Sequence, residues 1–64
     1  MTNNFIVKVT VFIKDGGQLT FRYVDKCMLE KDCLVCVSKK YFSSHVVPLT
    51  NILYVEAVKE EDEG

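Results

Sequence analysis

The sequence of 64 residues predicts an all-β protein, and three observations lead to this prediction. Apolar and polar side chains alternate with a period of two over residues 5–14, which is the pattern of a half-buried strand. β-Branched residues are frequent in the body of the chain, and they favour strands over helices. Apolar residues do not recur at the spacing of three and four that an amphipathic helix requires. We therefore expect short strands joined by tight turns.

Residues 5–14 and 19–23 are expected to form the first hairpin. Odd-numbered residues are apolar in both runs, so they share one face of the pair. The expected loop has three residues, 15–17, and a loop of this kind needs a positive φ at its last residue. We assign that φ to Gly17, since glycine adopts it without steric cost. The opposed pairs in this register are Ile13 with Leu19, Val11 with Phe21, and Val9 with Tyr23.

Shorter apolar runs predict the remaining strands. In chain order they are a continuation of the second strand around a bend (25–29), a polar turn (30–32), a third strand (33–38), a fourth strand (43–47), one 3₁₀ turn (49–51) and a last strand (52–58). The third strand is apolar on both faces, which is typical of a central strand. Pro48 ends the fourth strand because proline cannot donate to a ladder.

Charge divides the chain into two parts. Residues 59–64 hold one of the eight basic residues and four of the nine acidic ones, so the rest is mildly basic. We expect residues 1–58 to form a single small β domain, because a chain of this length rarely holds more than one. Residues 59–64 are expected to form a disordered acidic tail, since like charges repel and nothing apolar is present to bury.

The expected order of elements resembles that of SH3-like and Sm-like small β-barrels. The shared features are a long first hairpin, a bent second strand and a tight turn before a short terminal strand. The resemblance is architectural and covers most of the chain. It implies a barrel of five or six strands, with a strongly bent antiparallel sheet as the alternative. The chain lacks the peptide-binding residues of SH3 domains, the Sm motif and the N-terminal helix of Sm-like proteins, so the resemblance implies no site residue.

The sequence contains few residues suited to catalysis. His45 is the only histidine, and it follows Ser43 and Ser44 without a signature of nucleophilic catalysis. The two adjacent glycines are explained by the hairpin turn, so no phosphate loop is indicated. We expect no enzymatic activity and no cofactor.

The three cysteines and His45 form one formal metal-ligand set. The set is Cys27, Cys33, Cys36 and His45. Cys33 and Cys36 flank residues that favour an extended strand, on which positions three apart point to opposite faces. We therefore expect free thiols rather than a zinc site or a Cys33–Cys36 disulfide. An odd number of cysteines without a recognisable secretion signal predicts a cytoplasmic location, and no apolar run is long enough to indicate membrane insertion.

The outer face of the first hairpin is the candidate binding site. In the expected register it carries Ile6, Lys8, Thr10, Phe12, Lys14, Thr20, Arg22, Val24 and Lys26, which include four basic residues and no acid. The partner-binding residues we predict are Lys8, Phe12, Lys14, Arg22 and Lys26. Phe12 and Arg22 are of the types that anchor protein interfaces. A basic face with an aromatic also suits single-stranded nucleic acid. The third interpretation is an ordinary solvated face, on which a later strand or a second subunit covers Ile6 and Phe12.

From these observations we expect a non-enzymatic binding protein that docks on a protein partner as an adaptor or inhibitor. A phage-encoded inhibitor of a host protein fits this profile. The alternative is an Sm-like or cold-shock-like binder of single-stranded nucleic acid that uses the same face. We also expect a homodimer or a higher homo-oligomer, because a small sheet with apolar residues on both faces cannot bury them all within one chain.

Overall fold

The computed structural model describes residues 4–62 and shows an all-β chain, which confirms the predicted fold class. The elements are β1 (Phe5–Ile13), β2 (Gln18–Phe21), β3 (Lys26–Glu30), β4 (Cys33–Ser38), β5 (Ser43–Pro48), the 3₁₀ turn η1 (Leu49–Asn51) and β6 (Ile52–Glu61). The predicted strand 33–38 and the predicted 3₁₀ turn are therefore confirmed. No helix among the described residues has the length and apolar character of a membrane span.

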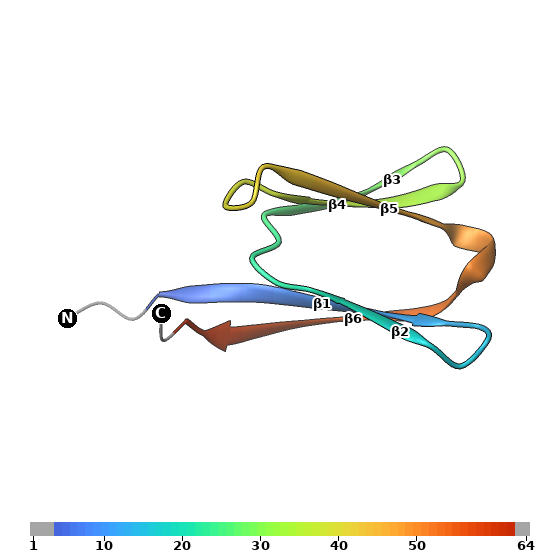
Figure 1. Cartoon of the computed structure of the whole chain (residues 1–64), viewed down its shortest axis with the longest axis horizontal. Helices are drawn as coiled ribbons and strands as arrows, with labels where there is room; N and C mark the ends of the chain where they lie inside the picture. Colours follow the sequence, from blue (N-terminus) through green and yellow to red (C-terminus); the bar gives the residue numbers. More distant parts are fainter. Residues whose placement is uncertain (1–3, 63–64) are drawn as a thin grey trace.

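The strands form two antiparallel layers that face each other (Figure 1). One sheet has the order β2-β1-β6 and the other has the order β3-β4-β5. Within the described residues no ladder joins β2 to β3 or β5 to β6, so neither the closed barrel nor the single bent sheet is observed. The physical reason lies in the two links. Tyr23 adopts a positive φ of 59° between β2 and β3, and η1 separates β5 from β6.

The first hairpin has the predicted kind of turn, one residue earlier than expected. Gly16 and not Gly17 has the positive φ, 101°. The N–H of Ile13 donates to the carbonyl of Gly17 (2.8 Å), and the N–H of Gly17 donates to the carboxylate of Asp15 (2.9 Å). The observed pairs are Val9 with Phe21, and Val11 with Leu19. The expected pairs Val9–Tyr23, Val11–Phe21 and Ile13–Leu19 are wrong, although Val9, Val11, Ile13 and Phe21 lie on the apolar face as expected.

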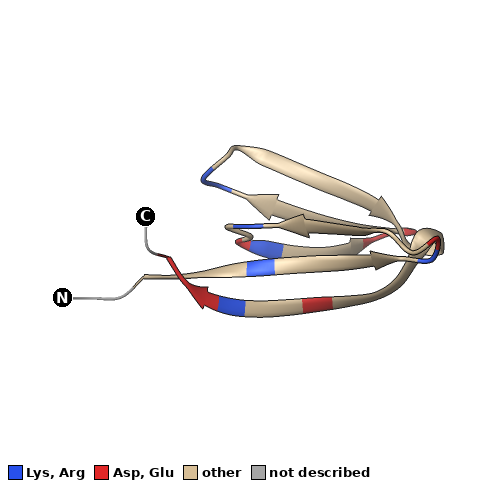
Figure 2. Cartoon of the chain, turned by 60° about the horizontal axis from the view of Figure 1, so that its bottom comes forward, with Lys and Arg blue, Asp and Glu red and all other residues tan. Residues whose placement is uncertain are grey.

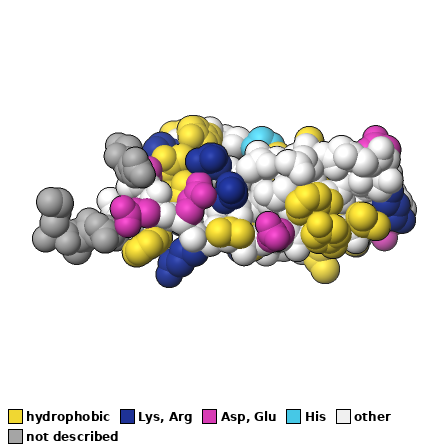
Figure 3. Space-filling model, turned by 90° about the horizontal axis from the view of Figure 1, so that it is seen from below, with side chains coloured by type: hydrophobic (Ala, Val, Ile, Leu, Met, Phe, Trp, Pro, Cys, Tyr) yellow, Lys and Arg dark blue, Asp and Glu magenta, His cyan; other side chains and the backbone are white. Residues whose placement is uncertain are grey.

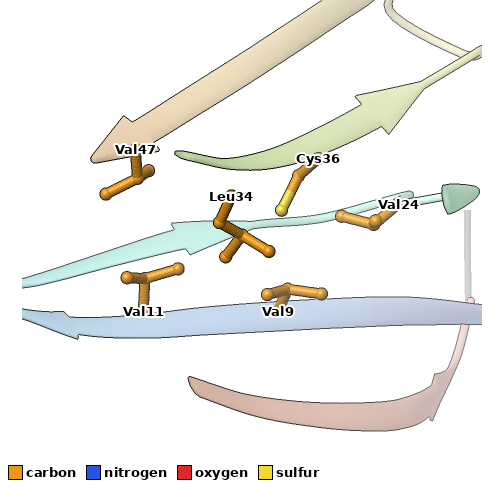
Figure 4. Close-up of a cluster of buried hydrophobic side chains, with 6 residues drawn as sticks. All are labelled: Val9, Val11, Val24, Leu34, Cys36 and Val47. Carbon is orange, nitrogen blue, oxygen red and sulfur yellow. The ribbon is translucent and has the colours of Figure 1, made fainter. Parts of the chain in front are cut away.

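A small core lies between the two layers. Its buried apolar residues are Val9, Val11, Val24, Leu34, Cys36 and Val47. Figure 4 shows the side chains of Val9 and Val11 pointing from β1 toward those of the opposite layer. Val24 was expected on the outer face of the hairpin, and this expectation is wrong. The backbone turns at Tyr23, which brings Val24 into the core with 8% of its surface exposed.

The last strand is longer than expected. β6 continues to Glu61, and the N–H of Asp62 donates to the carbonyl of Asn4 (2.8 Å). Residues 59–61 thus pair with β1, where we had expected a disordered tail. The charge of Glu60 is compensated by nearby basic side chains, which explains how an acidic segment joins the sheet. Residues 63–64 of the expected tail lie outside the described residues.

Candidate functional site

The outer face of the sheet β2-β1-β6 carries charges of both signs. The cross-strand pairs on this face are Phe12 with Tyr54, Thr10 with Glu56, Lys8 with Val58, and Ile6 with Glu60. Figure 2 shows acidic segments of β6 beside the basic segment of β1. Our expectation of a purely basic face is therefore wrong, because β6 completes the sheet next to β1 and brings its own acids.

Glu60 forms ion pairs with two of the basic side chains that we predicted to bind a partner. Its carboxylate lies 3.6 Å from the Nζ of Lys8 and 3.0 Å from the guanidinium of Arg22. All three side chains are partly exposed, so each pair contributes little to stability. The pairs nevertheless reduce the positive potential that a phosphate backbone would require.

The predicted site residues are only partly brought together. Lys8 and Phe12 lie on the outer face of β1, and Arg22 directly follows β2. Lys14 lies in the turn after β1, where its N–H donates to the carbonyl of Asn51 (2.9 Å). Lys26 does not belong to this surface, because it pairs with Val37 in the other sheet. The link after β2 changes layers, which the period-two pattern did not reveal.

An aromatic stack forms the apolar part of the outer face. The rings of Phe12 and Tyr54 are 4.4 Å apart at an angle of 17°, and 54% of Tyr54 is exposed. The pairing passes from Phe12–Tyr54 to Ile13–Ile52, so Leu53 is an extra residue in a β-bulge. Leu53 is 64% exposed. Figure 3 shows hydrophobic side chains gathered at one end of this face, beyond the charged ones.

β6 is an edge strand of its sheet, and within residues 4–62 no strand pairs with its outer edge. The N–H of Asp62 donates to the carbonyl of Asn4, which shows which residues of β6 bond to β1. From Tyr54 to Glu60, beyond the register shift, these are the even-numbered residues. The N–H and C=O groups of Val55, Ala57, Lys59 and Glu61 therefore point away from β1, sideways from the edge of the sheet. This is the longest of the four sheet edges, with ten residues in β6 against four in β2 and five in β3. The fourth edge, β5, ends in Pro48, which has no N–H.

A second aromatic cluster connects the layers at the other end of the sheet. The Tyr23 hydroxyl donates to the Asp62 carboxylate (2.9 Å), and the Tyr41 ring meets the Tyr23 ring edge-on at 5.5 Å. The Nζ of Lys40 lies 3.7 Å from the centre of the Tyr23 ring. Interaction with Tyr23 raises the pKa of Lys40, so the side chain stays charged. The cluster ties the link after β2 to the end of β6, and we assign it a structural role.

The structure does not bring together the formal metal-ligand set Cys27, Cys33, Cys36 and His45. Cys27 and Cys36 are opposed, with 3.4 Å between their sulfur atoms, but Cys33 lies on the other face of β4. The ring of His45 stacks on Phe21 at 4.3 Å. Among residues 4–62, no three His, Cys, Asp or Glu side chains are grouped so that they could hold a metal ion. The prediction that Cys33 and Cys36 point to opposite faces is confirmed.

Cys36 is the chemically distinct member of the thiol pair. Its surface is fully buried, whereas Cys27 is exposed. Burial raises the pKa of the Cys36 thiol to about 12, and hydrogen bonding to Cys27 and the charge of Cys27 act in the same direction. Cys36 is therefore protonated at neutral pH.

The residues that sequence reasoning missed are Tyr54, Glu56 and Glu60. All three lie on the outer face only because β6 pairs with β1. Their alternation in the last strand was a usable signal for a shared face, but nothing local showed which strand lies beside it. Comparison of the chain with models of protein families, with curated proteins and with solved structures gave no match.

Proposed function

We propose that this chain is a non-enzymatic protein-binding module that takes an extended segment of a partner protein onto the edge of β6. The observation that carries the proposal is the edge of β6, with which no strand of residues 4–62 pairs, beside the stack of half-buried Phe12 and exposed Tyr54. Addition of a strand to a sheet edge gives affinity through main-chain hydrogen bonds and specificity through alternate side chains. The module would act as an adaptor or as an inhibitor that covers a segment of its partner.

The outer face of β6 defines the chemistry of that segment. Tyr54, Glu56 and Val58 alternate along it, and a paired strand places one side chain opposite each. We expect apolar residues opposite Tyr54 and Val58, and Lys or Arg opposite Glu56. Glu60 already forms ion pairs with Lys8 and Arg22, so it contributes less to the choice of partner.

The mixed charge of this face favours a protein partner over nucleic acid. Glu56 and Glu60 lie among the basic residues that a phosphate backbone would contact. The salt dependence of the affinity distinguishes a protein partner from nucleic acid, because nucleic-acid binding weakens by orders of magnitude between about 50 and 200 mM salt. Binding through β6 and the aromatic stack is expected to change little over that range.

A proline in β6 tests the proposed edge. Ala57 directs its N–H out of the sheet, so Ala57→Pro removes an edge donor and leaves the β1 ladder intact. Ala57→Val keeps the N–H and is the matched control. We expect Ala57→Pro to weaken partner binding at least about fivefold, since an unsatisfied partner group costs about 1–3 kcal/mol.

The assay is capture from a nuclease-treated lysate of the source organism at high and low salt. The proposal requires a protein retained by the wild type and by Ala57→Val but lost with Ala57→Pro. Equal retention by all three variants contradicts it, as does loss of all binding after nuclease treatment. A second copy of the chain is the other occupant to test. In that case sedimentation shows a dimer for Ala57→Val and a monomer for Ala57→Pro.

A further inference from the structure

We propose that Cys27 and Cys36 are a site of redox modification that closes to an intramolecular disulfide on reaction with a hydroperoxide. The two cysteines are directly opposed on neighbouring strands, and their sulfur atoms are 3.4 Å apart. One thiol is exposed and the other is buried beside it. This inference is independent of the proposed binding function.

The backbone already has the separation that a disulfide requires. The N–H of Leu49 donates to the carbonyl of Asp32 (2.8 Å), so the even-numbered residues of β4 bond to β5. Cys36 therefore bonds to His45, and Cys27–Cys36 is a non-hydrogen-bonded pair. Such pairs have Cα atoms about 4.5 Å apart. Disulfides span roughly 4.4–6.8 Å between Cα atoms, so the bond forms without displacement of either strand.

The difference in exposure decides which thiol reacts with the hydroperoxide and which one then closes the disulfide. Cys27 lies on β3, an edge strand of its sheet, and meets a dissolved oxidant first. Its thiolate attacks the hydroperoxide, which breaks the O–O bond and leaves Cys27 as a sulfenic acid and the peroxide as an alcohol or water. The Cys36 sulfur then attacks the Cys27 sulfur, and the thiol proton leaves with the hydroxyl group as water. Two thiols lose two electrons, and the hydroperoxide accepts them.

The third cysteine is excluded by its position. Cys33 is opposite Glu30 and Pro48, on the face of β4 away from Cys36. A disulfide between Cys33 and either partner would require one strand to turn over. The geometry thus selects one product from the three that three cysteines allow.

Peptide mapping of the intact chain tests the site. The protein is treated with hydrogen peroxide, its remaining thiols are alkylated, and it is digested with trypsin without reduction. Cleavage at Lys31 separates the two cysteines, so we expect peptides 27–31 and 32–39 joined by one disulfide, with Cys33 alkylated. Dithiothreitol should release both peptides.

Two single variants are the controls. Cys33→Ser should give the same product within about twofold in rate. Cys27→Ser changes an exposed residue and should abolish the disulfide, while buried Cys36 oxidises at least about tenfold more slowly. A disulfide that contains Cys33, a disulfide between two chains as the main product, or a sulfinic acid at Cys27 beside a reduced Cys36 would each overturn the proposal.

Discussion

The two long sides of the sandwich differ in how they are closed. On one side β2 lies over β5, and the stacked rings of Phe21 and His45 span the gap between the layers. We call this the closed side. The opposite side is bounded by β6 and β3, whose inner faces present Val55 and Leu29. Val55 is 42% exposed and Leu29 is 69% exposed, so we call this the open side.

The difference shows that two flat rings bridge a gap that branched aliphatic side chains leave open. The two sides also differ in their edge strands. The closed side has a short strand and a strand that ends in proline, both of which discourage further pairing. The open side has the ten residues of β6 and the exposed thiol of Cys27. Both proposed sites thus lie on the open side.

The largest expected effect on stability concerns Val11 and Val55, which are paired across β1 and β6 but differ in burial. Val11 and Val55 are opposed on the inner face, yet Val11 is fully buried. We expect Val11→Ala to lower the free energy of unfolding by about 2 kcal/mol or more, and Val55→Ala by less than about 1 kcal/mol. Urea titrations of both variants measure the difference. Equal losses would show that the open side is packed as tightly as the centre.

An alkaline titration tests how far water reaches the core from the open side. Burial raises the pKa of Cys36 from 9.0 to about 12, so the folded chain keeps a proton that the unfolded chain releases. The stabilisation is fully present below pH 9 and is lost as the pH rises toward 12. Relative to Cys36→Ala, the wild type should lose at most about 1.4 kcal/mol per pH unit in that window. A constant difference between the two proteins would mean that Cys36 is hydrated.

The smallest expected effect concerns the Phe21–His45 stack on the closed side. A double-mutant cycle with Phe21→Leu and His45→Ala should give a coupling energy of about 0.5–1.5 kcal/mol. Thermal or urea unfolding of the four proteins provides the values. Additive effects would show that the rings pack independently, and the distinction between the two sides would then rest on burial alone.

Local chemistry allowed much of the fold to be predicted. Alternation identified the residues that share a face, and Pro48 marked the end of β5. The turn was misplaced because Gly16 and Gly17 both accept a positive φ, and the hydrogen bond from Gly17 to Asp15 decides between them. Local patterns of this kind specify conformations but not distant neighbours.

The composition of the binding surface could not be predicted for that reason. A period of two shows which side chains share a face, but it does not show that β6 lies beside β1. Phe12 was identified from the first hairpin alone, whereas its partner Tyr54 and the ion-paired Glu60 come from the last strand. Lys26 was included because the change of layer at Tyr23 has no signature in the hydrophobic pattern.

The pairing of the first strand with the last also sets the order in which the chain can fold. The sheet β3-β4-β5 joins only strands that follow one another, so its contacts close short loops. The other sheet needs contacts between residues far apart in the sequence, such as Phe5 and Glu61, and contacts of that kind form slowly. During synthesis β1 keeps one edge uncovered until β6 has emerged. The edge that we propose for the partner is thus the last part of the fold to exist, and a strand added there follows the completion of the sheet.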